Sequence, residues 1–369
     1  MLERSGGADV LTTRLLNLFG PKGAPLAMGV TGLVLGIPVF FDIGIFILAP
    51  MVYVAAHRGG KSMVLYAMPM LAGLSMTHAF LPPHPGPVAA AGLLGVSLGW
   101  IIIMGLVCGI PAWLVSGVAW GSWIGKRVQV EVPDEFIPEE EEADTVHPPS
   151  LGLIAFIILA PMVLMLAATV ADVALDEGSL LSVLTLVGNP AIALTIAVML
   201  ALYLLGIRRG ISAAELAKIS GLALRPVGMI LLVVGAGAFF GAVLRATGIG
   251  DALADSMAAI GLPVIVSAYL ISCALRIAQG SATVAIVTTA GIIESSVTEG
   301  NYSPAQIALI VVAVSAGSII ASHVNDGGFW IVSRYFNMSV KDTLKTWTVL
   351  ETILSVVGFA MAGLVWLFV

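Results

Sequence analysis

The sequence predicts an all-α polytopic membrane protein, and its composition and its recurring apolar stretches carry this prediction. Only 10% of the 369 residues are charged, 59% are hydrophobic, and the mean hydropathy is +1.06. A soluble domain carries about 25% charged residues, because water must wet its surface. Apolar stretches of about 20 residues, long enough for a helix to span the hydrocarbon, recur along the whole chain.

Seven apolar stretches are expected to cross the membrane completely. In chain order they are 62–93, 96–123, 151–173, 189–207, 226–244, 305–333 and 346–369. Two others, 25–56 and 263–293, are too long for one ordinary span, and polar or glycine-rich residues interrupt them at 36–42 and 276–281. We interpret both as re-entrant hairpins of two half-helices. Non-helical backbone at membrane depth is tolerated only where protein or a watery cavity satisfies it.

The basic residues agree with this topology. When both hairpins enter and leave on one face, fourteen of the sixteen Lys and Arg residues fall on the same side of the membrane. Arg245 alone falls on the other side, and Arg276 lies within the membrane. Positive loops stay in the cytoplasm, so the first side is predicted to be cytoplasmic. It also holds the linker 124–150, whose acidic run Glu139–Glu142 is expected to be a solvated tether.

The two halves of the chain, 1–123 and 151–369, are predicted to be inverted repeats. Residues 2–18 match residues 244–260 at a constant offset of 242. In each half the match is followed by a hairpin, a polar-centred crossing and a plain crossing, and the two hairpins enter from opposite faces. The second half has three crossings within 151–244 before its match, so the first repeat is expected to be incomplete at its N-terminus.

Polar, proline-rich or glycine-rich segments interrupt four apolar stretches at corresponding places in the two halves. Proline lacks the amide hydrogen and glycine relaxes the backbone, so these segments are expected to be unwound. Unwinding exposes backbone amides and positive helix ends that suit an anion, and paired broken segments indicate a transporter site. The interrupted stretches are the hairpins 25–56 and 263–293 and the broken transmembrane helices 62–93 and 305–333.

Arg276, near the tip of the second hairpin, is the strongest single candidate for a functional residue. An arginine at membrane depth costs at least about 2.5–3.5 kcal/mol on insertion scales, so it needs a partner or a purpose. One interpretation is that its guanidinium binds a substrate carboxylate. The alternatives are a structural pair with Asp42 or Asp326, or a side chain that reaches the membrane interface.

Proton coupling is expected to use ionisable side chains in the broken segments. A buried carboxyl group holds a proton more readily than one in water, and histidine titrates near neutrality. In the alternative interpretation the aspartates cap half-helices and the histidines bond backbone carbonyls. The candidates are Asp42, Asp326 and His323 for proton coupling, and His78 and His84 for proton coupling or substrate binding.

Neutral hydrogen bonds of the kind that a polyhydroxy substrate needs are expected from Ser281, Thr283 and Asn325. Ser and Thr in membrane helices usually bond their own backbone, which is the alternative for the first two. No metal-ligand cluster, nucleotide loop or nucleophile elbow stands out in the sequence, so no cofactor is expected, and an enzyme or ATP-driven pump is disfavoured. Cys108 and Cys273 are expected to be packing residues, and the net charge of −6 gives no indication of nucleic-acid binding.

Three motifs make the chain resemble the gluconate permease family. They are THAFLPPHPGP at 77–87, LRIAQGSATVA at 275–285 and SHVNDGGFW at 322–330. The segment 341–358 resembles the family too, and the similarity runs from Met1 to the C-terminus. The resemblance implies a secondary transporter of the cell inner membrane that imports gluconate or a related sugar acid by proton symport. It also implies a wider ion-transporter superfamily, in which homodimers are common.

The chain departs from the family in its length and at two positions. Family members usually extend further at the N-terminus, which agrees with an incomplete first repeat. They often have Pro at the position of Gly327 and Tyr-Glu at Phe41–Asp42. Two other functions stay open: a sodium-coupled carrier of organic anions or D-serine, and a truncated membrane component that does not transport. Sodium dependence of uptake separates the first of these from proton symport.

Overall fold

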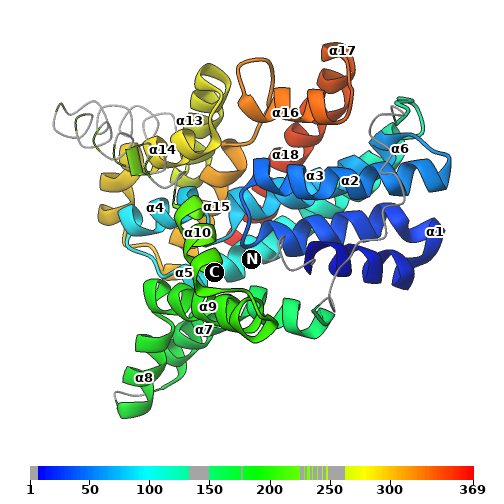
Figure 1. Ribbon diagram of the computed structural model, residues 1–369. Helices are drawn as coiled ribbons and strands as arrows, with labels where there is room; N and C mark the ends of the chain where they lie inside the picture. Colours follow the sequence, from blue (N-terminus) through cyan, green and yellow to red (C-terminus); the bar gives the residue numbers. More distant parts are fainter. Residues whose placement is uncertain are drawn as a thin grey trace.

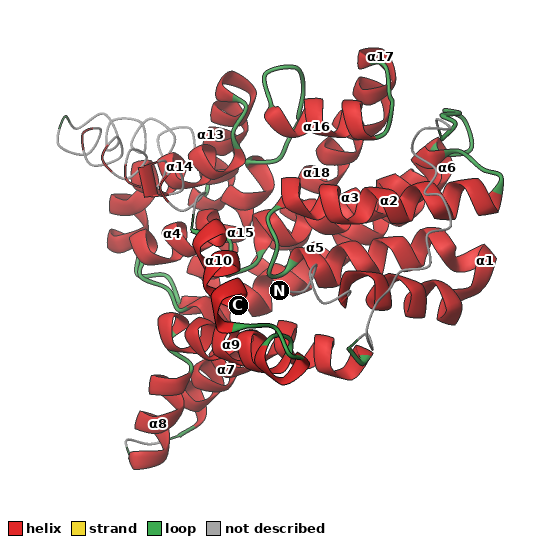
Figure 2. Ribbon diagram, viewed as in Figure 1, coloured by secondary structure: helices red, strands yellow, loops and turns green. Residues whose placement is uncertain are grey.

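The computed structural model describes residues 7–132, 149–175, 178–224 and 262–369, with a few single positions between 228 and 247. Every regular element in these ranges is a helix, and Figure 2 shows no strand among them. The prediction of an all-α protein is therefore confirmed.

Several sequence-based predictions concern parts of the chain outside the described residues. Because nothing is described there, these predictions stay as they were. They are the acidic run Glu139–Glu142 with most of the linker 124–150, the match between 2–18 and 244–260, and most of the crossing 226–244.

Five helical segments of the described chain are long and apolar enough to cross a membrane, as expected of a multi-pass membrane protein. Each overlaps a predicted crossing. The predicted crossing 305–333 is divided instead into two short helices. The five segments are Met63–Leu94, Leu98–Ile124, Leu151–Asp172, Pro190–Arg209 and Val340–Trp366.

The first half contains a helical hairpin and a broken helix. The hairpin is α1 (Gly7–Gly36) and α2 (Phe41–Gly59), so its turn lies within the segment where the sequence predicts a break. The broken helix is α3 (Met63–Phe80) and α4 (Pro85–Leu94). Two successive prolines follow α3 and cannot continue its hydrogen bonds, whereas Pro85 suits the first position of α4.

One long helical stretch completes the first half. It consists of α5 (Leu98–Trp113), the π-helical segment η1 (Leu114–Trp120) and α6 (Gly121–Ile124). It packs against α3 on one side and against the C-terminal helix on another.

A separate group of helices follows in the middle of the chain, drawn in green in Figure 1. It comprises α7 (Leu151–Ala174), the short α8 (Ser179–Val187) and α9 (Pro190–Leu204). A turn at Ile207–Arg209 then leads to α10 (Ala213–Ala223). α8 and α10 were not predicted, since nine and eleven residues are too short to register as crossings. Only 17% of the apolar window in the α9 span is buried, so this helix exposes apolar surface suited to lipid.

The second half repeats the order of hairpin, broken helix and long helix. Its break differs from the prediction in one respect: α13 runs through Arg276 and ends only at Gln279, because Gly280, with φ 78°, supplies the left-handed C-cap. The elements are the hairpin α13 (Val264–Gln279) and α14 (Ala282–Glu299), the broken helix α15 (Pro304–Gly317) and α16 (Gly327–Tyr335), and the stretch α17 (Val340–Thr343), η4 (Leu344–Thr348) and α18 (Val349–Trp366).

Each hairpin turn lies against the break of the following helix in its own half. In the first half, His84 Nε2 lies 2.7 Å from the carbonyl oxygen of Gly36. In the second half, the backbone at Gly280 is so close to Asn325 that a Cβ there would lie 2.3 Å from its carbonyl oxygen. The four interruptions are therefore held together as two pairs.

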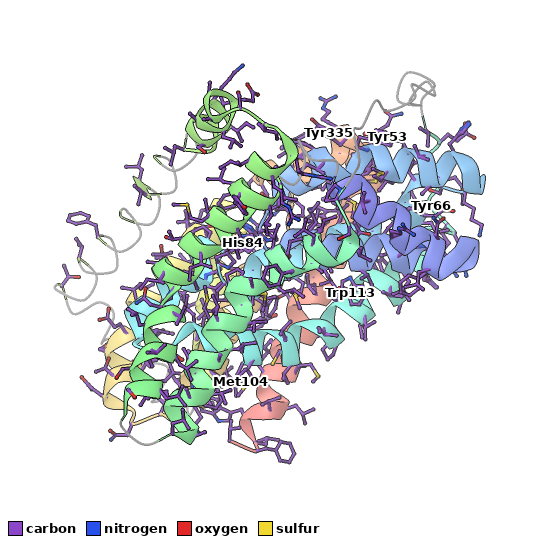
Figure 3. All side chains as sticks on the ribbon, turned by 60° about the horizontal axis from the view of Figure 1, so that its bottom comes forward. Tyr53, Tyr66, His84, Met104, Trp113 and Tyr335 are labelled. Atoms are coloured by element: carbon purple, nitrogen blue, oxygen red, sulfur yellow. The ribbon has the colours of Figure 1, made fainter. Side chains whose placement is uncertain are left out.

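The half-helices also pack across the two halves. α4 lies against α14, and α2 lies against α16. The second contact includes the Tyr53 hydroxyl, which donates to the carbonyl oxygen of Tyr335 at 2.5 Å, and Figure 3 shows the two labelled tyrosines side by side. These contacts between half-helices of different halves bring all four interruptions towards one place near the middle of the protein.

Candidate functional site

A cavity of about 600 Å³ lies where the four interruptions meet. Its wall is formed by both hairpin turns, both helix breaks, η4 and α18, so residues far apart in the sequence share it. The polar lining residues are Asp42, Ser75, His78, Arg276, Ser281, Thr283, Asp326 and Glu351, and the aromatic ones are Phe40, Phe41, Phe46 and Trp347.

The N-termini of four half-helices face this cavity. The first residues of α2, α4 and α16, which are Phe41, Pro85 and Gly327, all line it, and so does Ala282, the first residue of α14. The positive end of a helix dipole and its free amide groups attract anions. Four such ends around one small space favour a negatively charged ligand.

Arg276 is buried, with 5% of its side chain exposed, and it lines the cavity from the last turn of α13. Its guanidinium forms an ion pair with Asp326 and donates to the carbonyl oxygen of Gly280. Its Nε has no hydrogen-bond partner among the described residues. The structural pair considered from sequence is therefore present with Asp326, while Nε is buried without a partner among the described residues.

Asp326 has several partners besides Arg276. Its carboxylate accepts from the backbone N–H of Gly328 at 2.9 Å, so it caps α16, and it also accepts from the hydroxyl of Ser322. Ser322 in turn accepts from Trp347 Nε1 at 2.8 Å. This network ties the helix break to η4 and holds the guanidinium of Arg276 at the cavity wall.

Asp42 lies in the first turn of α2 and lines the cavity, with an exposed side chain. Phe40, not Asp42, occupies the cap position of this helix and makes no side-chain cap. Asp42 thus has an exposed side chain at the cavity that the Arg276–Asp326 pair also lines.

The three candidate histidines occupy different places. His78 lines the cavity, and its Nδ1 has no partner among the described residues. His84 is buried behind it, with the ring centres 4.7 Å apart, and bonds the carbonyl oxygen of Gly36 instead of lining the cavity. His323 Nδ1 lies 2.8 Å from the carbonyl oxygen of Ala321, also outside the lining.

Of the three candidates for neutral hydrogen bonds, two line the cavity and one does not. Ser281 and Thr283 line the cavity, and the Ser281 hydroxyl caps α14 by accepting from Val284 N–H at 3.4 Å. Asn325 does not line it; its Nδ2 donates to the carbonyl oxygen of Ile277 at 2.8 Å, which fastens the helix break to the hairpin.

Sequence reasoning missed Glu351, which lies on α18 with 2% of its side chain exposed and lines the cavity. It is the only charged residue in the stretch 346–369, and this isolation could have identified it as a candidate from the sequence. Its partner Ser75 and the aromatic residues Phe46 and Trp347 were missed as well, because nothing in the sequence distinguishes them from packing residues.

The fold is that of a membrane transporter of known structure. The crystal structure of the YdaH transporter of Alcanivorax borkumensis, which is described as having an unusual topology, superposes with a TM-score of 0.56. The match covers 100% of this chain and 83% of that one at 16% sequence identity, so it concerns the fold alone.

The GntP family permease model matches residues 1–369, and the chain therefore belongs to this family. It is 42% identical to the inner membrane permease YgbN of Escherichia coli, over 99% of this chain and 82% of that protein. It is 36% identical both to the low-affinity gluconate transporter of E. coli, over 99% of this chain and 81% of that protein, and to its Gnt-II system L-idonate transporter, over 97% and 81%. The chain is thus a membrane permease and not an enzyme.

Proposed function

We propose that this permease imports gluconate or a closely related sugar acid by proton symport. The observation that carries the proposal is the cavity in which Arg276 and four half-helix N-termini converge. Relatives that share at least a third of its residues transport gluconate or L-idonate by name.

The size and polarity of the cavity fit such a substrate. A volume of about 600 Å³ lies within the range of about 300–1,000 Å³ found for small-molecule sites. The substrate carboxylate accepts a charge-assisted hydrogen bond from the guanidinium of Arg276, which lines the cavity. Its hydroxyl groups bond Ser281, Thr283 and His78 on the surrounding wall, and Asn325 and His84 support the loops from behind.

The charges around the cavity support coupling to protons. Arg276 is the one cationic side chain of the described lining when His78 is neutral, whereas Asp42, Asp326 and Glu351 are all acidic. With all three carboxyl groups ionised, the wall would carry an excess negative charge and would repel an anion. Binding a proton together with the substrate removes this repulsion and lowers the charge that must be moved through the membrane.

The architecture supports alternating access by inverted repeats. Each half has a hairpin followed by a broken helix, and the substrate site lies between them, which is the plan of many secondary transporters. The α2–α16 and α4–α14 contacts join the halves, so movement of one half reshapes the cavity wall. The excess of basic residues on one side supports a cytoplasmic linker, and the similarity to an inner membrane permease supports the cell inner membrane for this protein.

Uptake of labelled gluconate into proteoliposomes tests the proposal. An inward acid gradient is expected to drive accumulation, and a protonophore is expected to abolish it. Unlabelled L-idonate and D-serine serve as competitors that rank the substrates, and protein-free liposomes are the control. Accumulation driven by an inward sodium gradient, and indifferent to the acid gradient, would show a sodium-coupled carrier instead.

A further inference from the structure

The carboxyl group of Glu351 occupies an unusual position for an acidic side chain. It lies near the middle of the apolar segment Val340–Trp366 and is 2% exposed, yet it forms part of the cavity wall. One oxygen accepts from the hydroxyl of Ser75 at 3.0 Å. The other, Oε1, has no hydrogen-bond partner among the described residues.

The surroundings of Glu351 contain no direct countercharge within the described part of the chain. Arg276 lines the same cavity but is paired with Asp326, and His78 and Asp42 are the other ionisable groups of the wall. Of the elements packed on α18, α15 and η1 contribute no ionisable side chain, α5 contributes only Cys108, and α3 contributes Tyr66 and His78, while Lys345 on η4 is exposed.

These surroundings suit a carboxyl group that binds and releases a proton. An ionised carboxylate with a single neutral donor is expensive in a dry interior, whereas the neutral acid has its remaining oxygen free to carry the hydrogen. Asp326 lacks this freedom, because Arg276, Ser322 and an α16 amide already satisfy its ionised form.

The backbone before Glu351 strengthens the assignment. The π-helical segment η4 ends three residues earlier, and Trp347 and Glu351, one on each side of this end, both line the cavity. π-helical turns inside α-helices often mark functional sites, because they redirect side chains that a regular helix would place elsewhere.

We propose that Glu351 carries the proton that is symported with the anionic substrate, an assignment that rests on the proposed function. Outside water supplies the proton to Oε1 of the empty carrier. The neutral acid then donates a hydrogen bond to the substrate within the cavity. After the carrier reorients and the anion leaves, the proton passes to water on the inner side, and Glu351 is ready for the next cycle.

Calorimetric titration of the purified full chain with gluconate, in buffers of different ionisation enthalpy, tests this directly. The wild type is expected to take up little proton on binding at acid pH, where the carboxyl group is already protonated. Uptake is expected to rise towards one proton for each bound anion as the pH is raised. Glu351→Gln, which imitates the neutral acid, is expected to bind gluconate without taking up a proton. Glu299→Gln, at the exposed end of α14, is the matched control and should behave as the wild type.

Each outcome decides the proposal. Proton uptake by Glu351→Gln equal to that of the wild type overturns it, as does a folded Glu351→Gln protein that binds no gluconate, because Glu351 would then be a substrate ligand. Thermal unfolding of each variant establishes folding, and Glu351→Asp, which keeps the carboxyl group, should retain proton uptake if Gln fails to fold. If the wild type itself binds gluconate without proton uptake, the proton coupling of the proposed function fails, and Glu351 is not at issue.

In proteoliposomes the same variant should separate exchange from accumulation. Glu351→Gln is expected to exchange labelled for unlabelled gluconate at a rate that no longer depends on pH, and to lose accumulation driven by an acid gradient. Asp42→Asn is the informative comparison within the cavity. If Asp42→Asn loses gradient-driven accumulation and Glu351→Gln retains it, the proton carrier is Asp42.

Discussion

Arg276 and Asp326 form a largely buried ion pair that joins the last turn of α13 to the cap of α16. The pair connects the second hairpin to the break in the following helix and places the guanidinium at the cavity wall. A buried pair of this kind contributes little net stability, but breaking it leaves one charge without compensation. Arg276 therefore has both a structural role and, in the proposed function, a role in binding the anion.

Replacing Arg276 by Gln should separate these two roles. The single variant leaves Asp326 unpaired and is expected to lose about 3–5 kcal/mol of folding stability. Transport should fall about 10- to 100-fold in kcat/KM, since losing one charge-assisted hydrogen bond to the substrate costs about 1.5–3 kcal/mol. Adding Asp326→Asn should restore thermal stability but not uptake. Arg127→Gln, on an exposed side chain, is the matched control. Recovery of uptake in the double variant would contradict a role of Arg276 in binding.

Gly280 should be intolerant of any side chain. A Cβ at this position would lie 2.3 Å from the carbonyl oxygen of Asn325, and the residue also has φ 78°. Gly95 has a similar φ of 69° but nothing within 4 Å of a Cβ, so Gly95→Ala should cost only the left-handed strain of about 1–2 kcal/mol. Gly280→Ala should cost more and abolish uptake, because it pushes the hairpin turn away from the helix break. Equal melting temperatures and equal uptake of the two variants would refute the tight contact.

The two adjacent histidines should have different effects when replaced by alanine. His84→Ala removes the bond to the carbonyl oxygen of Gly36 and should lower stability by about 1–3 kcal/mol, because a buried acceptor loses its partner. His78→Ala should change the melting temperature less and raise the KM for gluconate, since His78 lines the cavity. Thermal unfolding and uptake kinetics of both variants measure this. A larger loss of stability in His78→Ala than in His84→Ala would reverse the assignment.

The close packing of α1 on α3 should depend on small residues. A Cβ at Gly32 would lie 2.3 Å from the carbonyl oxygen of Met70, so Gly32→Ala must push the two helices apart. We expect a loss of about 1–3 kcal/mol from overpacking. Gly363 on α18 has nothing within 4 Å of a Cβ, and Gly363→Ala should be neutral or slightly stabilising. Unfolding of the two purified variants in detergent checks the contrast, and a melting temperature of Gly32→Ala at or above that of the wild type would exclude tight packing.

Much of the site could be predicted from the sequence, because charged residues and prolines are rare in membrane-spanning stretches and therefore stand out. Arg276, Asp42 and Asp326 are charged residues in apolar stretches, and the prolines around His84 break a helix wherever they occur. Glu351 is also a charged residue in an apolar stretch, but it was not predicted, since no glycine or proline break marks the residues around it. The interruptions themselves follow from backbone chemistry, so their positions were predicted within a few residues.

The sequence by itself determined that the protein is helical, lies in a membrane, breaks its helices at four places and belongs with the gluconate permeases. These properties depend on local composition and on motifs that can be read along the chain. Only the tertiary structure decided that Arg276 pairs with Asp326 rather than Asp42, that His84, His323 and Asn325 stand outside the cavity, and that Glu351 and Ser75 stand within it. Such choices depend on which helix faces come together, and packing between residues that are hundreds of positions apart leaves no trace in local sequence patterns.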